Sequence, residues 1–135
     1  IGKERMKGAY AWQLYLKQGT IIAGGSDFPV ESANPFFGIH AAVTRQDADN
    51  KPAGGWYPDQ AMSVIEAFRA FTLDAAYAAH AENTQGTLQP GRWADFILVD
   101  RDIFTVDPSQ TRTTQVLETW VGGKQVYVSS SSTKH

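Results

Sequence analysis

One carboxylate stands where α/β enzymes often do chemistry. Asp27 lies in the segment 25–31 (GSDFPVE), directly after the apolar run 20–23 (TIIA). An apolar run without polar alternation is typical of a strand buried on both faces, and ligands gather beyond the carboxyl ends of such strands. Asp27 is therefore a candidate metal ligand and general base. The alternative is a loop aspartate that bonds nearby backbone N–H groups.

The other chemical candidates are weaker. The sequence has three histidines but neither a His-x-His pair nor a His-Glu-x-x-His motif, so a closed zinc site cannot be assembled from it. His40 lies among apolar residues and is either a packing residue or part of a site near Asp27. The long loop 32–58 suggests a lid or site wall, which makes its Trp56 a second candidate for substrate binding.

Composition limits the classes of function. The chain has 135 residues, 42% of them hydrophobic and 19% charged, which is enough for one ordered domain. A net charge of −2 without a basic tract argues against nucleic acid as a partner. No apolar run approaches the ~20 residues of a membrane helix. The absence of cysteine leaves the compartment open, with a slight preference for the cytoplasm. Because the chain begins with Ile rather than Met, we expect it to be processed or excised from something longer.

The first part of the chain predicts an α/β segment. We expect a helix over 4–18, stopped by Gly19, and then a buried strand over 20–23. A short helix is expected over 39–45. Ser63 and Glu66 match a capping box, which predicts the start of another helix at Ser63. A further helix is expected over 73–80, capped by Thr72.

The last third has a different character. A buried strand is expected over 96–99, and a hairpin over 114–128 with Gly122 and Gly123 as its two-residue loop. These patterns divide the chain into an α/β part over 1–82, a small β part over 83–128 and a frayed polar tail over 129–135.

Several segments resemble one enzyme family. The C-terminal part of family 3 amidohydrolases is similar to segment 25–31 and to three later segments, namely 41–45 (AAVTR), 55–58 (GWYP) and 69–72 (RAFT). The nearest subgroup resembles the N-substituted formamide deformylase-like enzymes. Segment 86–96 (GTLQPGRWADF) resembles a signature found across the amidohydrolase superfamily. The resemblance extends to about Tyr127.

The resemblance implies a fold and an activity. It implies a metal-dependent hydrolase of amides and related C–N bonds, built as a (β/α)8 barrel with an accessory β-sandwich. Residues 20–26 would be the eighth barrel strand, 59–82 the helices that follow, and 86–128 strands of the sandwich. Asp27 would be the strand-eight aspartate that binds a divalent metal, zinc by preference, and shuttles the proton.

The chain departs from the family in what it lacks. The family's His-x-His, bridging residue and later histidines lie upstream of anything present here, and a (β/α)8 barrel takes about 250 residues. We therefore expect this chain alone to bind no metal and to lack hydrolase activity. We also expect exposed apolar surface that binds a second copy or the missing barrel. The alternative is a non-catalytic assembly or binding module derived from the same fold.

Overall fold

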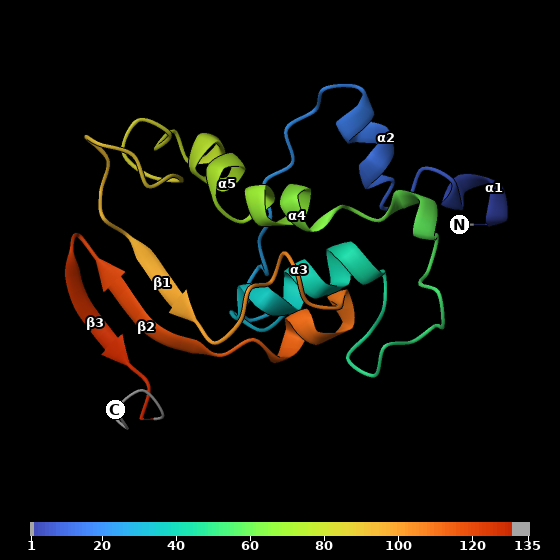
Figure 1. The fold of residues 1–135 in the computed structure, drawn as a ribbon. Helices are drawn as coiled ribbons and strands as arrows, with labels where there is room; N and C mark the ends of the chain where they lie inside the picture. The colour runs from blue at the N-terminus through green and yellow to red at the C-terminus, as the bar shows by residue number, and fades with distance from the viewer. Residues whose placement is uncertain (1, 131–135) are drawn as a thin grey trace.

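The computed structural model describes residues 2–130, so most of the predicted tail, residues 131–135, lies outside it. A small sheet lies on one side of the molecule and the first two helices on the other, with the remaining helices between and above them (Figure 1). The helices are α1 (Lys3–Met6), α2 (Trp12–Lys17), α3 (Pro35–Thr44), α4 (Val64–Ala70) and α5 (Leu73–Ala78), with 3-10 turns η1 (Pro58–Gln60) and η2 (Pro108–Thr113). The strands are β1 (Phe96–Val99), β2 (Val116–Val121) and β3 (Lys124–Val128). The described residues include no helix long and apolar enough to cross a membrane.

The predicted helix over 4–18 is wrong in its extent, because the chain forms two helices there. The break falls at Tyr10, whose φ of 51° is left-handed and cannot continue a right-handed helix. The predicted stop at Gly19 is confirmed. Its φ is 81°, and its N–H donates to the Leu16 carbonyl at 2.9 Å after α2 ends.

The predicted strand over 20–23 does not form in this chain. A strand needs a neighbour to pair with its backbone N–H and C=O groups, and the N–H groups of residues 21–23 donate to nothing within residues 2–130. The segment is instead fastened at its far end, where the Gly24 N–H donates to the Ala70 carbonyl at 2.8 Å. It is an apolar extended segment without a partner strand.

The capping residues explain where the longer helices begin. The Asn34 side chain accepts a hydrogen bond from the Phe36 N–H at 3.0 Å, and Pro35 follows the cap, so α3 starts before the predicted residue 39. The capping box at Ser63 is confirmed. The Glu66 N–H donates to Ser63 Oγ at 3.2 Å, and the Ser63 N–H donates to the Glu66 carboxylate at 2.8 Å.

Thr72 does not cap α5 as predicted. Its hydroxyl donates back to the Phe68 carbonyl at 2.8 Å, within the preceding helix, and no side-chain hydrogen bond caps α5. A hydroxyl that bonds the carbonyl four residues earlier is a common competing arrangement for threonine.

One ring joins three parts of the chain. The Phe71 side chain lies so close to Gly24 and Gly38 that a Cβ atom on either glycine would stand 2.8 Å or 2.4 Å from it. Glycine at both positions therefore lets Phe71 pack directly on the backbone. This contact connects the extended segment, α3 and the end of α4.

The buried core lies between α3, α4 and the loop after β1. Ile103, from that loop, is 5% exposed and packs with residues of the helices. The buried members of this cluster are Phe36, Ile39, Ala42, Met62, Ala67 and Ile103. The 3-10 turn η2 also packs on α3, so residues of the last third complete the core of the first part.

The sheet is antiparallel with the strand order β1-β2-β3 (Figure 1). The predicted hairpin is confirmed, with Gly122 and Gly123 at φ 56° and 74° between β2 and β3. The predicted burial of residues 96–99 is wrong for Ile97 and Leu98, which are 43% and 46% exposed. Within the described residues β1 has a neighbour on one side only, which leaves this strand at a sheet edge.

We expect Ser63→Ala to lower the free energy of unfolding by about 1 kcal/mol at neutral pH. Hydrogen bonds from the Ser63 backbone N–H, and then from its hydroxyl, help to lower the pKa of Glu66. A carboxyl with a lowered folded pKa stabilises above its unfolded value and loses that contribution as the pH falls through the folded pKa. The difference between wild type and variant should therefore shrink below pH ~4.3. Urea unfolding measured between about pH 3 and about pH 7 tests both the loss of stability and its pH dependence.

Ser32→Ala is the matched control. The Ser32 hydroxyl accepts one hydrogen bond, from the Asn34 N–H at 3.3 Å, and belongs to no capping box. Loss of this hydroxyl should lower the free energy of unfolding by less than Ser63→Ala does. The loss should also not depend on the protonation of Glu66. Equal costs for the two variants at every pH would contradict the reciprocal cap.

Candidate functional site

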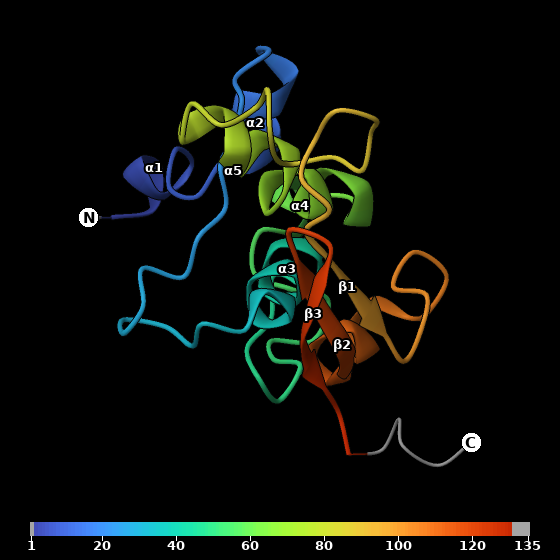
Figure 2. The same ribbon diagram turned by 90° about the vertical axis from the view of Figure 1, so that its left-hand side faces the viewer.

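Asp27 lies in a tight turn with its carboxylate free. The turn is closed by backbone groups, because the Val30 N–H donates to the Asp27 carbonyl at 2.9 Å and the Glu31 N–H to the Ser26 carbonyl at 3.2 Å. The Asp27 side chain is exposed and accepts no hydrogen bond within residues 2–130. The segment between α2 and α3 that carries it extends away from the helices and sheet (Figure 2). The carboxylate is thus not occupied in capping the turn.

The described residues do not fit a complete metal site. Within residues 2–130 no group of three or more His, Cys, Asp or Glu side chains is placed to hold a metal ion. A catalytic zinc ion takes three protein ligands, and the Asp27 carboxylate is a single group. Any metal at Asp27 would need further ligands from outside these residues.

His40 lies on the buried side of α3. It is 1% exposed, and its Nε2 lies 2.9 Å from the Asn50 side-chain oxygen. Because that oxygen can only accept, the contact assigns the proton to Nε2. Nδ1 is buried and has no partner within the described residues. A role of His40 in substrate binding stays a prediction, and its present contacts are those of a packed side chain.

Trp56 belongs to an aromatic cluster around Arg45. The Arg45 guanidinium lies 4.4 Å from the Trp12 ring centroid and 4.8 Å from that of Trp56. Its Nε donates to the Trp56 carbonyl at 2.9 Å and its Nη1 to the Tyr10 carbonyl at 3.2 Å. The Trp56 ring also contacts the Tyr57 ring edge-on, with 4.6 Å between the two ring centroids. These contacts fix the loop 54–58 to the end of α3 and to the break before α2.

Arg45 is the residue that the sequence did not single out. It is only 7% exposed, and its burial lowers the pKa of the guanidinium. No carboxylate pairs with it among the described residues, and Nη2 is buried without a partner there. Two indole rings and two carbonyl groups hold the charge instead. In the sequence, the only sign of this arrangement is an arginine that precedes a loop containing a tryptophan.

The structure does not bring the three predicted residues together. The Asp27 turn leads into the N-terminal end of α3, whereas the Trp56 N–H donates to the carbonyl of Arg45, the C-cap of that helix. A helix of ten residues spans about 15 Å. His40 lies between these ends on the buried side. No hydrogen bond or ring contact within residues 2–130 joins Asp27, His40 and Trp56.

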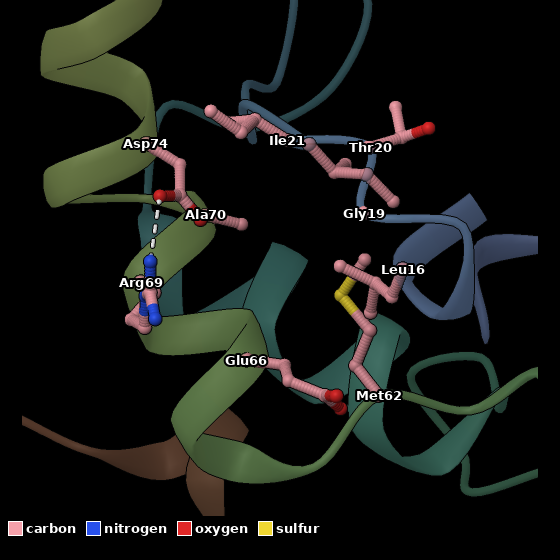
Figure 3. A pocket seen from close by; sticks show the side chains of 10 residues that line it. Leu16, Gly19, Thr20, Ile21, Met62, Glu66, Arg69, Ala70 and Asp74 are labelled. Atoms are coloured by element: carbon pink, nitrogen blue, oxygen red, sulfur yellow. Dashed lines mark hydrogen bonds and ion pairs between the residues drawn. The ribbon is translucent and has the colours of Figure 1, made fainter.

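A groove of about 320 Å³ runs beside the extended segment. Leu16, Ile21 and Met62 give it apolar walls, and Glu66 of α4 points toward Met62 (Figure 3). At one rim Arg69 pairs with Asp74 at 3.4 Å. Ile21 is 50% exposed there although it belongs to an apolar run. The groove therefore follows a segment that lacks its packing partner.

Comparison with known families gives a clear result. The sequence model of the amidohydrolase family matches residues 1–127. The chain belongs to the amidohydrolase family. This confirms the resemblance drawn from the segments around Asp27, Arg45, Trp56 and Phe71.

Three curated relatives place the chain within the family. It is 33% identical to YtcJ of Bacillus subtilis over 130 residues, covering 96% of this chain and 25% of that protein. It is 38% identical to LONG AFTER FAR-RED 3 of Arabidopsis thaliana over 131 residues, or 94% of this chain and 21% of the relative. N-substituted formamide deformylase of Arthrobacter pascens is 29% identical over 117 residues, with 87% and 21% covered. The chain thus spans a quarter or less of each relative's length.

A solved amidohydrolase structure shows the same fold over most of the chain. The amidohydrolase of Thermotoga maritima superimposes with a TM-score of 0.59 at 18% identity, covering 89% of this chain and 26% of that one. The predicted mixed α/β fold is confirmed to this extent: the chain matches one part of an amidohydrolase.

The Trp56 loop depends on glycine at position 55, and we expect Gly55→Ala to be strongly destabilising. Gly55 has φ 84°, and an added Cβ would lie 2.4 Å from the Thr44 carbonyl oxygen. Left-handed backbone costs about 1–2 kcal/mol, and the overlap should add about 1–3 kcal/mol. Urea unfolding followed by tryptophan fluorescence measures the loss.

Gly54→Ala provides the control. Gly54 has a similar φ of 79°, but an added Cβ would meet nothing within 4 Å. It should therefore show only the backbone cost. If both variants lose the same free energy of unfolding, the close approach of Gly55 to the end of α3 does not hold the loop.

Proposed function

We propose that this chain is the carboxyl-terminal part of a metal-dependent amidohydrolase that cleaves amide-type C–N bonds. One observation carries the proposal: in a chain of this family, an apolar segment without a partner strand ends in a free, exposed carboxylate, Asp27. The family match and the position of Asp27 support one another, because catalytic groups in barrel enzymes follow the ends of strands.

In this proposal residues 20–26 form the last strand of the barrel. The free N–H groups of residues 21–23, the exposed Ile21 side chain and the adjoining groove are the features expected of a strand whose neighbours are absent. Strands β1 to β3 would belong to the accessory sandwich, whose remaining strands would cover Ile97 and Leu98. The fold of this chain supports that assignment without containing the barrel.

The proposed task of Asp27 is to move a proton. An exposed carboxylate with no other hydrogen bond can accept the proton of a water molecule that attacks the amide carbonyl carbon, and can then deliver it to the departing nitrogen. The metal of the family, zinc by preference, would supply Lewis acidity, with Asp27 as one ligand and the others from the missing part. The isolated chain should then bind no metal stoichiometrically and hydrolyse no amide.

In the complete protein that contains this chain, we expect Asp27→Asn to reduce amide hydrolysis at least ~100-fold. The amide side chain keeps the size of the carboxylate but cannot accept a proton. Steady-state turnover of an N-substituted formamide, with zinc content measured in parallel, tests the expectation.

Glu31→Gln removes a carboxylate from the other side of the same turn and is the matched control. It is also exposed, and we expect it to keep most of the activity. Unchanged turnover in Asp27→Asn, or equal losses in both variants, would show that Asp27 has no specific part in the reaction.

We further expect the isolated chain to self-associate through the groove beside residues 20–23. Burying an isoleucine side chain contributes about 1.5–3 kcal/mol, so Ile21→Asp should weaken association at least ~10-fold. Sedimentation over a range of concentrations measures this.

Leu88→Asp is the control, because Leu88 is 68% exposed but lies outside the groove. A monomer at all concentrations, or equal effects of the two variants, would contradict the assignment of the groove as the uncovered face.

A further inference from the structure

A second cavity lies away from Asp27 and from the groove. It has a volume of about 720 Å³, is open to solvent, and is lined by residues of the N-terminal end of α3, of η2 and of strands β2 and β3. Its lining within the described residues includes Phe37, Arg112, Thr114, Thr119 and Tyr127. None of these lining residues is acidic. The cavity thus offers a cation, an aromatic ring and hydroxyl groups without a carboxylate.

Arg112 is the cation, and its charge is unpaired. The guanidinium lies 3.8 Å from the centroid of the Phe37 ring, and it makes no hydrogen bond or ion pair with any residue from 2 to 130. Stacking uses the face of the guanidinium and leaves the N–H groups in its plane free. Two parallel N–H groups of an arginine match the two oxygens of a carboxylate.

The charge of Arg112 acts on Asp47, which lies in one turn with Lys51. The lowered pKa of Asp47 is caused first by the hydrogen bond from the Lys51 N–H and next by that from Asp49, while the charge of Arg112 acts last. Asp47 is therefore held within its own turn, and it forms no ion pair with Arg112 in residues 2–130. The guanidinium stays available to an acceptor in the cavity.

Thr114 provides a second, independent sign of a ligand. It is 3% exposed, and its hydroxyl has no hydrogen-bond partner among the described residues. A buried hydroxyl without a partner is costly and uncommon in native structures. Thr119 and Tyr127 place further hydroxyl groups around the same cavity, while Phe37 and Val116 make part of its wall apolar.

We propose that this cavity binds a small organic carboxylate with an apolar body. Arg112 holds the carboxylate, and Phe37 both supports the guanidinium and contacts the apolar part of the ligand. Threonine hydroxyl groups donate to the remaining oxygen lone pairs. The site stands apart from the proposed hydrolase activity, because none of its residues belongs to the Asp27 turn or to the groove.

Titration of the chain with benzoate, followed by ¹H–¹⁵N correlation spectra, tests the proposal. Benzoate has a carboxylate on a flat apolar ring, and a ligand of this size should bind with a dissociation constant on the order of 1 mM. Saturable shifts should be confined to residues around Phe37, Arg112 and Thr119. Benzamide, the neutral analogue of equal size, should bind at least ~10-fold more weakly.

Variants separate the charge of Arg112 from its packing. Arg112→Gln should weaken benzoate binding at least ~10-fold, and Arg112→Lys, which keeps the charge but loses the fork, should fall between. Arg69→Gln is the control, since it removes an arginine that lines the other groove, and it should leave affinity unchanged.

The proposal is overturned by equal binding of benzoate and benzamide to the wild-type chain, by shifts spread over the basic surface, or by unchanged affinity in Arg112→Gln. Should Arg112→Gln not fold, the comparison of benzoate with benzamide and the Arg112→Lys variant still decide the outcome.

Discussion

The packing of Phe71 against Gly24 and Gly38 is the contact on which the arrangement of this chain depends. Through this contact the backbone at the end of the extended segment packs close to α3 and the end of α4. The hydrogen bond from the Gly24 N–H to the Ala70 carbonyl holds the segment at the same place. Asp27 follows only three residues later. A partly buried aromatic ring thus sets the direction in which the chain leaves the core and presents its free carboxylate.

The same segment lacks a packing partner. Residues 21–23 combine apolar side chains with backbone N–H groups that donate to nothing in the described structure, and Ile21 is half exposed. Strand β1 repeats the situation at the sheet edge, with Ile97 and Leu98 half exposed. Both the segment 20–23 and strand β1 lie in the region matched to the amidohydrolase family, and the chain covers only 21–25% of three curated relatives.

Local chemistry determined which elements could be predicted from the sequence. The capping box at Ser63 and the glycine pair of the hairpin succeeded because their hydrogen bonds and φ angles are set within a few residues. The break before α2 was missed although Gly8 follows the end of α1, because the left-handed residue is Tyr10 and not that glycine. The strand over 20–23 failed because pairing is a property of two segments. Asp27 could be named as a candidate from its place after an apolar run, whereas the burial of Arg45 depends on rings brought from residues 12 and 56.

The candidate site residues are arranged along helix α3. The Asp27 turn leads into its N-terminal end, and Asn34, which caps that end, also lines the cavity with Arg112. Trp56 is bonded to the opposite end through Arg45, about 15 Å away along a helix of this length. A substrate held at Asp27 would therefore have to extend along the whole helix to reach Trp56. Since burial and two hydrogen bonds already hold the loop at Arg45, the simplest task for Trp56 in this chain is to keep that loop in place.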